Sequence, residues 1–315
     1  MRKTILSLIV SVMLPAATFA QPKLCGNVVN ARGWSGSQYS DPFGIYSFDA
    51  SDATLQLKTE ATSRYMLGRG GGVADADNVY LYDVEMDGTY VYGTIYLMEK
   101  TEYNARTYAR IGSPFDVPTA MTWDASTKNI YGCFYSNNAS GYEFGVLTIA
   151  SGRADRTRIS KLSERIVALS DDDNGTLYAI GKSGMLYTIS PTEGTLTEIG
   201  ATGIIPSENI QCACYDGGII YWAAQTSDNK SNLYKVDPTT GSATLAGSFP
   251  KNEHFSCLYK FQAAAEDDAP AAITDMTTDF EGPSLTGTLS FTLPDKTFAG
   301  EDLSCLLYTS PSPRD

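Results

Sequence analysis

The sequence predicts an all-β fold in which repeated four-stranded sheets surround a common axis, a β-propeller. Three observations support this prediction. A short phrase of alternating apolar and polar residues recurs about every 47 residues. Polar turns rich in Asp, Asn and Gly separate the copies. No stretch between the copies has the hydrophobic period of a helix. The copies begin at residues 45, 95, 146, 186 and 233.

Each repeat is expected to form four antiparallel strands. The innermost strands include residues 119–123, 167–170 and 211–214, and an acidic turn follows each of them. The second strand then begins at Ile130, Leu177 or Ile220. The recurring phrase is the third strand, and turns such as 190–194 and 237–241 lead to the fourth. Asp-rich and Asn-Gly turns between alternating runs are typical of hairpins because these residues tolerate positive φ angles.

The two ends of the repeat region are expected to complete one sheet together. Residues 24–29 match second-strand segments, so the first repeat lacks its innermost strand. Residues 255–259 match innermost strands and follow the last full repeat. Pairing of these two segments would close the ring and leave no incomplete blade. The count is then five blades, or six if residues 65–112 contain two poorly matched hairpins.

The innermost strands carry small residues where five strands would crowd the axis, because larger side chains would overpack it. These residues are Val73, Ala120, Ala168, Cys212 and Cys257.

A charged residue lies four positions before each of these small residues. The five are Arg69, Asp116, Glu164, Glu208 and Glu253. If the repeats align, four carboxylates and one guanidinium surround one mouth of the channel, an arrangement suited to a metal ion, an amine or a sugar. The alternative is that they are solvated loop residues, the usual state of charged residues in so acidic a chain. We predict a ligand-binding ring, no catalytic residue and no cofactor, and leave the presence of a metal open.

Other motifs favour structural roles. The acidic run Asp171–Asp173 lacks the spacing of a calcium-binding EF-hand and indicates a hairpin turn. The glycines at 70–72 precede a strand rather than a helix, so they do not predict a phosphate site. His254 is the only histidine, and no G-x-S-x-G motif accompanies it. The three tryptophans are expected in blade cores, with stacking on sugars as the alternative.

Composition excludes some partners. A formal net charge of −13 argues against nucleic acid and anionic membranes. Five of the six cysteines precede residue 300, and their odd number and scattered spacing argue against a disulfide framework or a zinc site. We therefore expect buried free thiols.

The amino-terminal residues 1–20 have the pattern of a secretory signal peptide. Arg2 and Lys3 precede an apolar run at residues 5–14, and small residues precede Gln21. We expect cleavage before Gln21 and export to the periplasm, the extracellular space or the outer cell surface. The mature part is expected to contain no transmembrane segment.

Beyond the propeller at residues 21–262, residues 263–269 form a polar linker. Alternating strands at 270–276 and 287–294 resemble the first two strands of a fibronectin type III-like domain, which would be incomplete at 270–304. Residues 305–315 resemble the translation of a transposase sequencing adapter. We therefore expect the natural protein to continue past Ser304.

The signal peptide, the Tyr/Asp repeat and the onset PAAITDMTTDFEG together resemble exported propeller-plus-fibronectin proteins of anaerobic Gram-negative gut bacteria. This resemblance implies surface or adhesin-like roles. Our leading hypothesis is a non-catalytic secreted or surface-associated protein that binds a glycan, a peptide or a protein with one propeller face. One alternative is a carbohydrate-active enzyme that uses the axial carboxylates for glycoside hydrolysis. Another is a structural spacer within a longer adhesin.

Overall fold

In the computed structural model, the described residues form 22 β-strands and no helix. The structure describes residues 23–30, 44–60, 70–87, 90–100, 106–111, 116–136, 141–150, 152–207, 211–228, 230–249, 251–260, 277–281 and 286–290. The chain divides into two compact units, Met1–Phe261 and Gln262–Asp315. No helix in the described part of the chain is long and apolar enough to cross a lipid bilayer.

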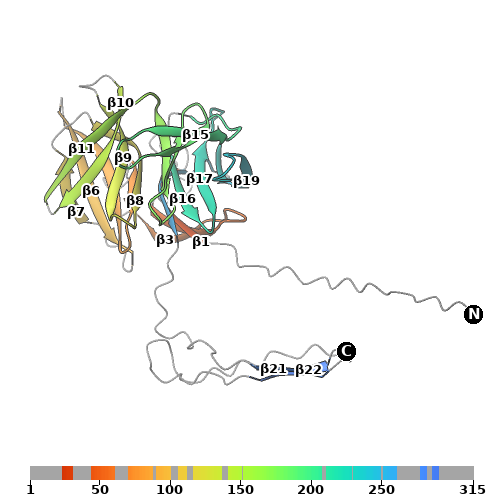
Figure 1. Ribbon diagram of the computed structural model, residues 1–315. Coiled ribbons are helices and arrows are strands. Elements are labelled where there is room, and N and C mark those ends of the chain that lie inside the picture. Colours follow the sequence, from red (N-terminus) through yellow and green to blue (C-terminus); the bar gives the residue numbers. More distant parts are fainter. Residues whose placement is uncertain are drawn as a thin grey trace, which may run out of the picture. The chain divides into compact units, whose positions relative to one another are not determined.

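The first unit contains five antiparallel blades of four strands each (Figure 1). Blade 1, from the axis outward, contains β20 (His254–Lys260), β1 (Lys23–Asn30), β2 (Gly44–Asp49) and β3 (Gln56–Glu60). Blade 2 contains β4 (Gly72–Ala74), β5 (Asn78–Asp87), β6 (Tyr90–Glu99) and β7 (Arg106–Ile111).

The other three blades follow the same order. Blade 3 contains β8 (Asp116–Asp124), β9 (Asn129–Ser136), β10 (Gly141–Ala150) and β11 (Gly152–Leu162). Blade 4 contains β12 (Ile166–Asp171), β13 (Leu177–Gly181), β14 (Met185–Ile189) and β15 (Leu196–Ala201). Blade 5 contains β16 (Cys212–Asp216), β17 (Ile219–Gln225), β18 (Ser231–Val236) and β19 (Ala243–Ser248).

The innermost strands close into a ring. Each contacts the next in the cycle β4, β8, β12, β16, β20 and back to β4. The described part of residues 65–112 contributes one blade, so the propeller has five blades rather than six. The small axial residues predicted from the sequence are all buried on these strands.

The two ends of the repeat region pair as predicted. β20 runs antiparallel to β1, with Leu24 opposite Lys260 and Asn27 opposite Cys257. The amide of Asn27 donates a hydrogen bond of 2.9 Å to the hydroxyl of Ser256, and both side chains are buried. Blade 1 is thus built from both ends of the repeat region, which removes two unpaired strand edges.

Every blade has a β-bulge at the same point between its third and fourth strands. In four blades the bulge falls within the recurring aliphatic-tyrosine pair, such as Ile45-Tyr46. In blade 3 it falls between Phe144 and Gly145. The repeat pattern places Val146-Leu147 at this position, which is two residues too late. A Cβ atom on Gly145 would lie 2.3 Å from the carbonyl oxygen of Thr157, so this bulge accepts no side chain.

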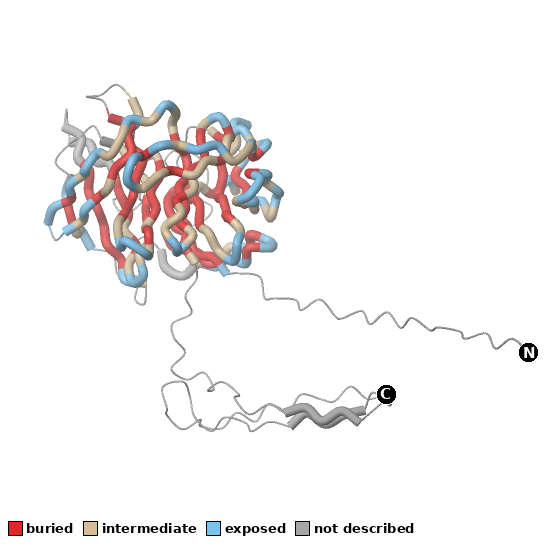
Figure 2. Tube along the Cα trace, in the orientation of Figure 1, coloured by how far each residue is buried: buried red, intermediate tan, exposed pale blue. Residues whose placement is uncertain are grey.

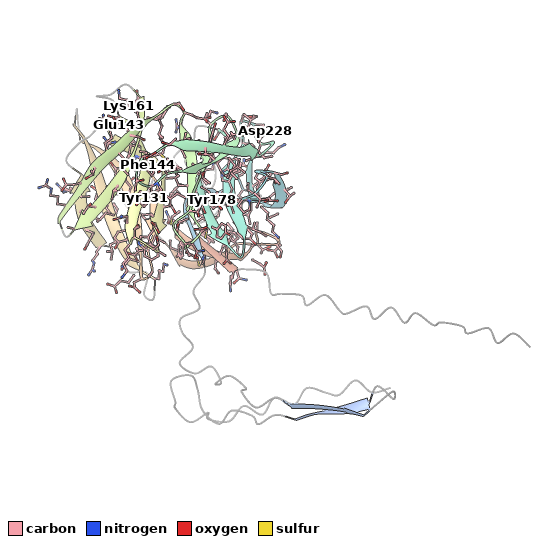
Figure 3. All side chains as sticks on the ribbon, viewed as in Figure 1. Tyr131, Glu143, Phe144, Lys161, Tyr178 and Asp228 are labelled. Carbon is pink, nitrogen blue, oxygen red and sulfur yellow. The ribbon has the colours of Figure 1, made fainter. Side chains whose placement is uncertain are left out.

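Hydrophobic clusters fill the seams between neighbouring blades, and the turns and outer strands carry most of the exposed residues (Figure 2). At the seam of blades 3 and 4, Tyr131 stacks on Phe144 with ring centroids 5.6 Å apart (Figure 3). Trp222 is fully buried between blades 4 and 5, which matches the core role expected for it. Stability thus depends on burial between blades as well as on pairing within them.

In blades 1, 3, 4 and 5, the segment after the third strand also contacts the outer strand of the preceding blade. In blade 5, Gly241 lies against Gly200 of blade 4, and Ala243 donates a backbone hydrogen bond to Thr202. Between blades 2 and 3 this contact becomes a strand pair, because β11 runs parallel to β7 with Gly152 opposite Ala109. Blades 2 and 3 therefore form one eight-stranded sheet.

Replacing Gly200 with alanine is expected to destabilise this outer contact. A Cβ atom there would lie 2.1 Å from the carbonyl oxygen of Thr240, so backbone must move. Overpacking of this kind costs about 1–3 kcal/mol. Urea denaturation should show that loss in the free energy of unfolding, whereas Thr197→Ala, at an exposed position of the same strand, should change it by less than about 0.5 kcal/mol. Equal effects of the two substitutions would contradict the prediction.

In the second unit, β21 (Thr277–Glu281) pairs antiparallel with β22 (Thr286–Ser290). The predicted strand at 270–276 lies outside the described residues, and the predicted strand at 287–294 overlaps β22. The fibronectin type III-like assignment stays a prediction. Residues 1–20, 263–269 and 305–315 also lie outside the described residues.

Candidate functional site

Two of the five residues of the predicted ring have described side chains. Glu164 precedes β12, and Glu253 precedes β20. Asp116 is the first residue of β8, but its side chain is not described. Arg69 and Glu208 lie outside the described residues. We call the end of the channel at which the innermost strands begin the upstream mouth, and Asp116, Glu164 and Glu253 lie at this end.

Glu164 is bound within its own blade. Its carboxylate accepts hydrogen bonds from the backbone N–H of Ser183 at 2.6 Å and from the hydroxyl of Tyr187 at 2.8 Å. A Cβ atom on Gly181 would lie 2.4 Å from Glu164 Oε2, so the glycine makes room for the carboxylate. Burial and the bond to Glu164 together raise the pKa of Tyr187. The carboxylate thus secures the β13–β14 hairpin of blade 4.

Glu253 is buried beside the end of blade 5. Its Oε2 accepts a hydrogen bond of 3.0 Å from the backbone N–H of Lys251, and its carbonyl oxygen accepts one from the hydroxyl of Ser231. The adjacent His254 contacts the amide of Gln225, and burial lowers the pKa of this histidine. Both described members of the predicted ring therefore have structural contacts, and ligand binding by the ring stays a prediction.

A small cavity lies between the innermost strands. Its volume is about 10 Å³, which holds about one water molecule. Pockets for small organic ligands usually exceed about 300 Å³, so this cavity is too small for a sugar ring. It is lined by Gly71, Gly72, Pro118, Thr119, Ala120, Met121, Gln211, Cys212 and Ser256.

At the opposite end of the channel, the downstream mouth, charged residues mark where the innermost strands end. β8, β12 and β16 end at an aspartate, β4 is followed by one, and β20 ends at a lysine. The residues are Asp75, Asp124, Asp171, Asp216 and Lys260. This end therefore also has four acids and one base, the composition that the sequence suggested for the upstream mouth.

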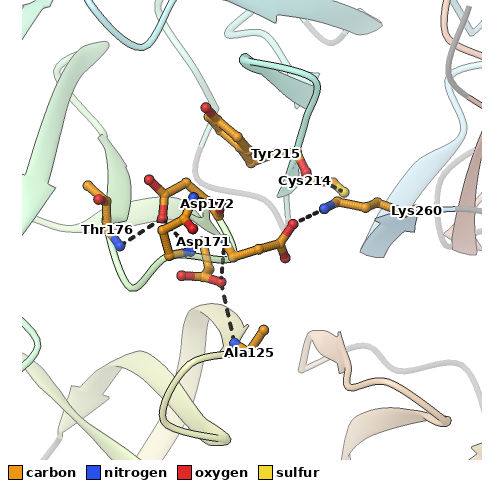
Figure 4. Close-up of polar contacts among 9 residues, drawn as sticks. Ala125, Asp171, Asp172, Thr176, Cys214, Tyr215 and Lys260 are labelled. Carbon is orange, nitrogen blue, oxygen red and sulfur yellow. Dashed lines mark hydrogen bonds and ion pairs between the residues drawn. The ribbon is translucent and has the colours of Figure 1, made fainter.

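Two lysines connect blades at the downstream mouth. Lys260 of blade 1 makes an ion pair with Asp173 of blade 4 (Figure 4), although these two blades are not neighbours in the ring. Burial lowers the pKa of Lys260, but the bond and charge of Asp173 outweigh it and raise the pKa overall. Lys100 of blade 2 lies over the ring of Tyr259, 5.0 Å from its centroid. Burial lowers the pKa of Lys100.

Asp124 and Asp171 lie at the same end but in different environments. Asp124 is fully buried and accepts hydrogen bonds from Ser126 and Thr127, which outweigh burial and hold its pKa below the usual value. Asp171 is 7% exposed. Burial raises its pKa to about 6, and the charges of Asp124 and Asp173 add to the increase.

Two tyrosines stack beside this charged group. The rings of Tyr178 on β13 and Tyr215 on β16 are 5.9 Å apart and nearly parallel, at an interplanar angle of 2°. Both are partly exposed and lie at the seam of blades 4 and 5. A flat aromatic surface next to charged hydrogen-bonding groups is a typical feature of binding sites.

The cysteines and the acidic turn, which were also considered as functional residues, make structural contacts. All five described cysteines are buried and free, as expected from the sequence. Burial strongly raises the pKa of Cys133, Cys212 and Cys257, so these thiols are unreactive. Asp172 caps its own turn by accepting backbone hydrogen bonds from Asn174 and Thr176, which supports the hairpin interpretation. Among the described side chains, no group of three or more His, Cys, Asp or Glu is placed to hold a metal ion.

The downstream mouth is not predicted from the sequence. The aspartates after the innermost strands indicate only turns there, and Asp124 and Asp172 do accept hydrogen bonds within their turns. The sequence does contain one indication of this charged group. Lys260 occupies the position at which the other repeats have an aspartate. The stacking of Tyr178 on Tyr215 had no counterpart in the sequence, since it depends on how two blades face each other.

Comparisons with known proteins give distant likenesses only. No protein-family model and no curated protein matches the chain. Among solved structures, a puromycin hydrolase is 13% identical over 78% of this chain, with a TM-score of 0.39. A periplasmic gluconolactonase of Pseudomonas aeruginosa is 13% identical over 71% of this chain and 81% of its own, with a TM-score of 0.40. A streptogramin B lyase is 10% identical over 66% of this chain and 77% of its own, with a TM-score of 0.37.

This chain spans 37% of the length of that puromycin hydrolase. At such identities and TM-scores, the likenesses support no inference about activity. The fold follows from the strand order and the closed ring described above, and the function has to be argued from the site.

Proposed function

We propose that this protein is a non-catalytic, exported binding protein whose propeller presents the downstream mouth to a glycan. The observation that supports this proposal most directly is the grouping of Tyr178 and Tyr215 with Asp173 and Lys260 at one end of the channel. Stacked tyrosines provide a flat apolar surface, and the ion pair provides hydrogen-bond donors and acceptors for hydroxyl groups. A peptide or protein ligand is the alternative for the same face.

Export is part of the proposal and depends on the predicted signal peptide at residues 1–20. The strongly acidic composition is consistent with a partner other than nucleic acid. The resemblance to exported propeller-plus-fibronectin proteins of gut bacteria points in the same direction.

A glycoside hydrolase that acts through the upstream carboxylates is less well supported. Hydrolysis requires one carboxyl group that donates a proton and a second about 5–9.5 Å away. Glu164 is bound to Ser183 and Tyr187, and Glu253 is buried against backbone. The cavity between the innermost strands also lacks room for a sugar ring. A role as structural spacer has no specific observation in its favour.

An array of immobilised neutral, acidic and amino-sugar glycans tests the proposal. Wild-type protein should bind a subset of the glycans, and Tyr215→Ala should weaken that binding about tenfold because it removes half of the stacked pair. The matched control is Tyr135→Ala at the upstream end, where Tyr135 is exposed and packs edge-on against Tyr142 at 5.7 Å. That variant should bind like wild type.

Three outcomes would contradict the proposal. Absence of binding to every glycan would exclude the glycan class. Loss of binding in Tyr135→Ala but not in Tyr215→Ala would move the site to the upstream mouth. Release of nitrophenol from aryl glycosides by wild-type protein would favour the hydrolase.

A further inference from the structure

At the downstream mouth, the seam between blades 3 and 4 contains two buried carboxyl groups, Asp124 and Asp171, to which the proposed function assigns no contact with the glycan. Alternate residues of a strand point to opposite faces. Asp124 shares the face of Ala120 on β8, and Asp171 shares the face of Leu169 on β12. Ala120 and Leu169 belong to the same core cluster, so both aspartates belong to the faces that form this seam.

The two carboxyl groups differ in how their oxygens are satisfied. Asp124 Oδ1 accepts hydrogen bonds from the backbone and hydroxyl of Ser126, and Oδ2 accepts one from the hydroxyl of Thr127 at 2.6 Å. Asp171 Oδ1 accepts the backbone N–H of Asp173 at 2.9 Å and that of Ala125 of blade 3 at 3.4 Å (Figure 4). Its Oδ2 is buried and makes no hydrogen bond within the described part of the chain.

The charges around Asp171 are mostly negative. Asp124 faces it from blade 3, while Asp172 and Asp173 follow it in its own loop. From blade 1, Lys260 is paired with Asp173. From blade 5, Asp216 lies near that lysine. Among the described ion pairs, none involves Asp124 or Asp171.

We propose that the Asp124–Asp171 pair makes the packing of blade 3 against blade 4 dependent on pH, and we call this contact the joint. The joint is stable while Asp171 carries a proton and is weakened when both carboxyl groups are ionised. A buried carboxylate with an unsatisfied oxygen beside a second carboxylate is costly, because desolvation and repulsion act together. Protonation removes the charge and turns the unsatisfied oxygen into a hydrogen-bond donor.

The sign of the pH effect follows from proton binding. The pKa of Asp171 is about 6 in the folded protein against a usual value of 3.8, so between these values the folded state binds more protons than the unfolded state. The contribution of Asp171 to the free energy of unfolding is therefore fully present below about pH 4 and is lost as the pH rises through 6. Over that range the folding equilibrium constant falls about 100-fold through Asp171 alone.

The joint also affects the downstream mouth, because Asp173, which pairs with Lys260, lies two residues after Asp171 in the same loop. Weakening of the seam would loosen the segment that holds the ion pair between blades 1 and 4. The proposal of the joint does not rest on the proposed glycan binding.

Carboxyl ¹³C NMR and urea denaturation between pH 4 and 8 test the joint. We expect the Asp171 carboxyl to titrate near pH 6 and Asp171→Asn to abolish the corresponding loss of stability. The matched control is Asp216→Asn in the equivalent turn of blade 5, which should keep the wild-type pH dependence. Hydrogen exchange at the Ala125 amide, corrected for its intrinsic pH dependence, should accelerate above pH 6 in wild type only.

A titration midpoint for Asp171 near about 4 would overturn the proposal, as would identical pH profiles of wild type and Asp171→Asn. If Asp171→Asn does not fold, the wild-type titration still decides. Asp124→Asn provides a second check, because loss of the neighbouring charge should lower the Asp171 midpoint. An unchanged midpoint in that variant would show that the two carboxyls are not coupled.

Discussion

Replacing Phe255 with alanine is expected to lower the free energy of unfolding by about 4 kcal/mol. Phe255 lies on β20, the strand that closes the ring, and its side chain is 1% exposed. Its ring packs against Phe249 at a centroid distance of 4.6 Å and against Phe48 of blade 1 at 5.7 Å. Truncation would leave a cavity at the seam of blades 5 and 1 and weaken the closure between β20 and β1.

Urea denaturation followed by tryptophan fluorescence measures this loss. The control is Leu245→Ala on the outer strand β19, where the leucine is 60% exposed, and its expected cost is below about 0.5 kcal/mol. A loss below about 1 kcal/mol for Phe255→Ala would show that closure of the ring does not depend on this cluster.

Glu143→Gln is expected to destabilise the protein by about 3 kcal/mol. Glu143 of β10 is buried and labelled in Figure 3. Its carboxylate accepts hydrogen bonds from Arg156 at 2.8 Å and Arg158 at 3.1 Å on the neighbouring strand β11. Arg156 is mostly buried and lies 5.0 Å from the centre of the Phe134 ring, so the substitution would remove the charge of Glu143 from beside a desolvated guanidinium.

The pH dependence of this variant provides a second measurement. Burial raises the pKa of Glu143, but the two arginines outweigh it and hold the pKa below the usual value. A lowered pKa in the folded state means that the stabilisation is present above about pH 4.5 and is lost as the pH falls below it. Glu143→Gln should therefore show a smaller loss of stability in acid than wild type.

Two controls separate a buried ion pair from a general effect of charge. Arg153→Gln removes the pair with Asp155, in which both side chains are largely exposed, and should cost less than about 1 kcal/mol. The double variant Glu143→Met with Arg156→Met should recover much of the stability, since it leaves no buried charge at either position. Equal stability of Glu143→Gln and wild type at pH 7 would contradict the prediction.

Local sequence patterns were sufficient to predict the fold class and the closure of the ring. Strand alternation, turn residues and the recurring phrase are local features, and the match of residues 255–259 to other innermost strands identified the closing segment. The register of blade 3 was misaligned because residue type favoured Val146-Leu147, whereas the bulge that sets the register requires a glycine at position 145.

By itself, the sequence determined where most strands recur, that they close into a ring of five or six blades, and which small residues line the axis. Only the tertiary structure decided which polar groups meet, because contacts such as Lys260 with Asp173 and Asp171 with Ala125 join segments from different blades. Repeat spacing places residues at equivalent heights in each blade, but it does not specify whether a carboxylate bonds its own hairpin, as Glu164 does, or faces a neighbour across a seam. That choice depends on the packing of side chains between sheets, which has no period in the sequence.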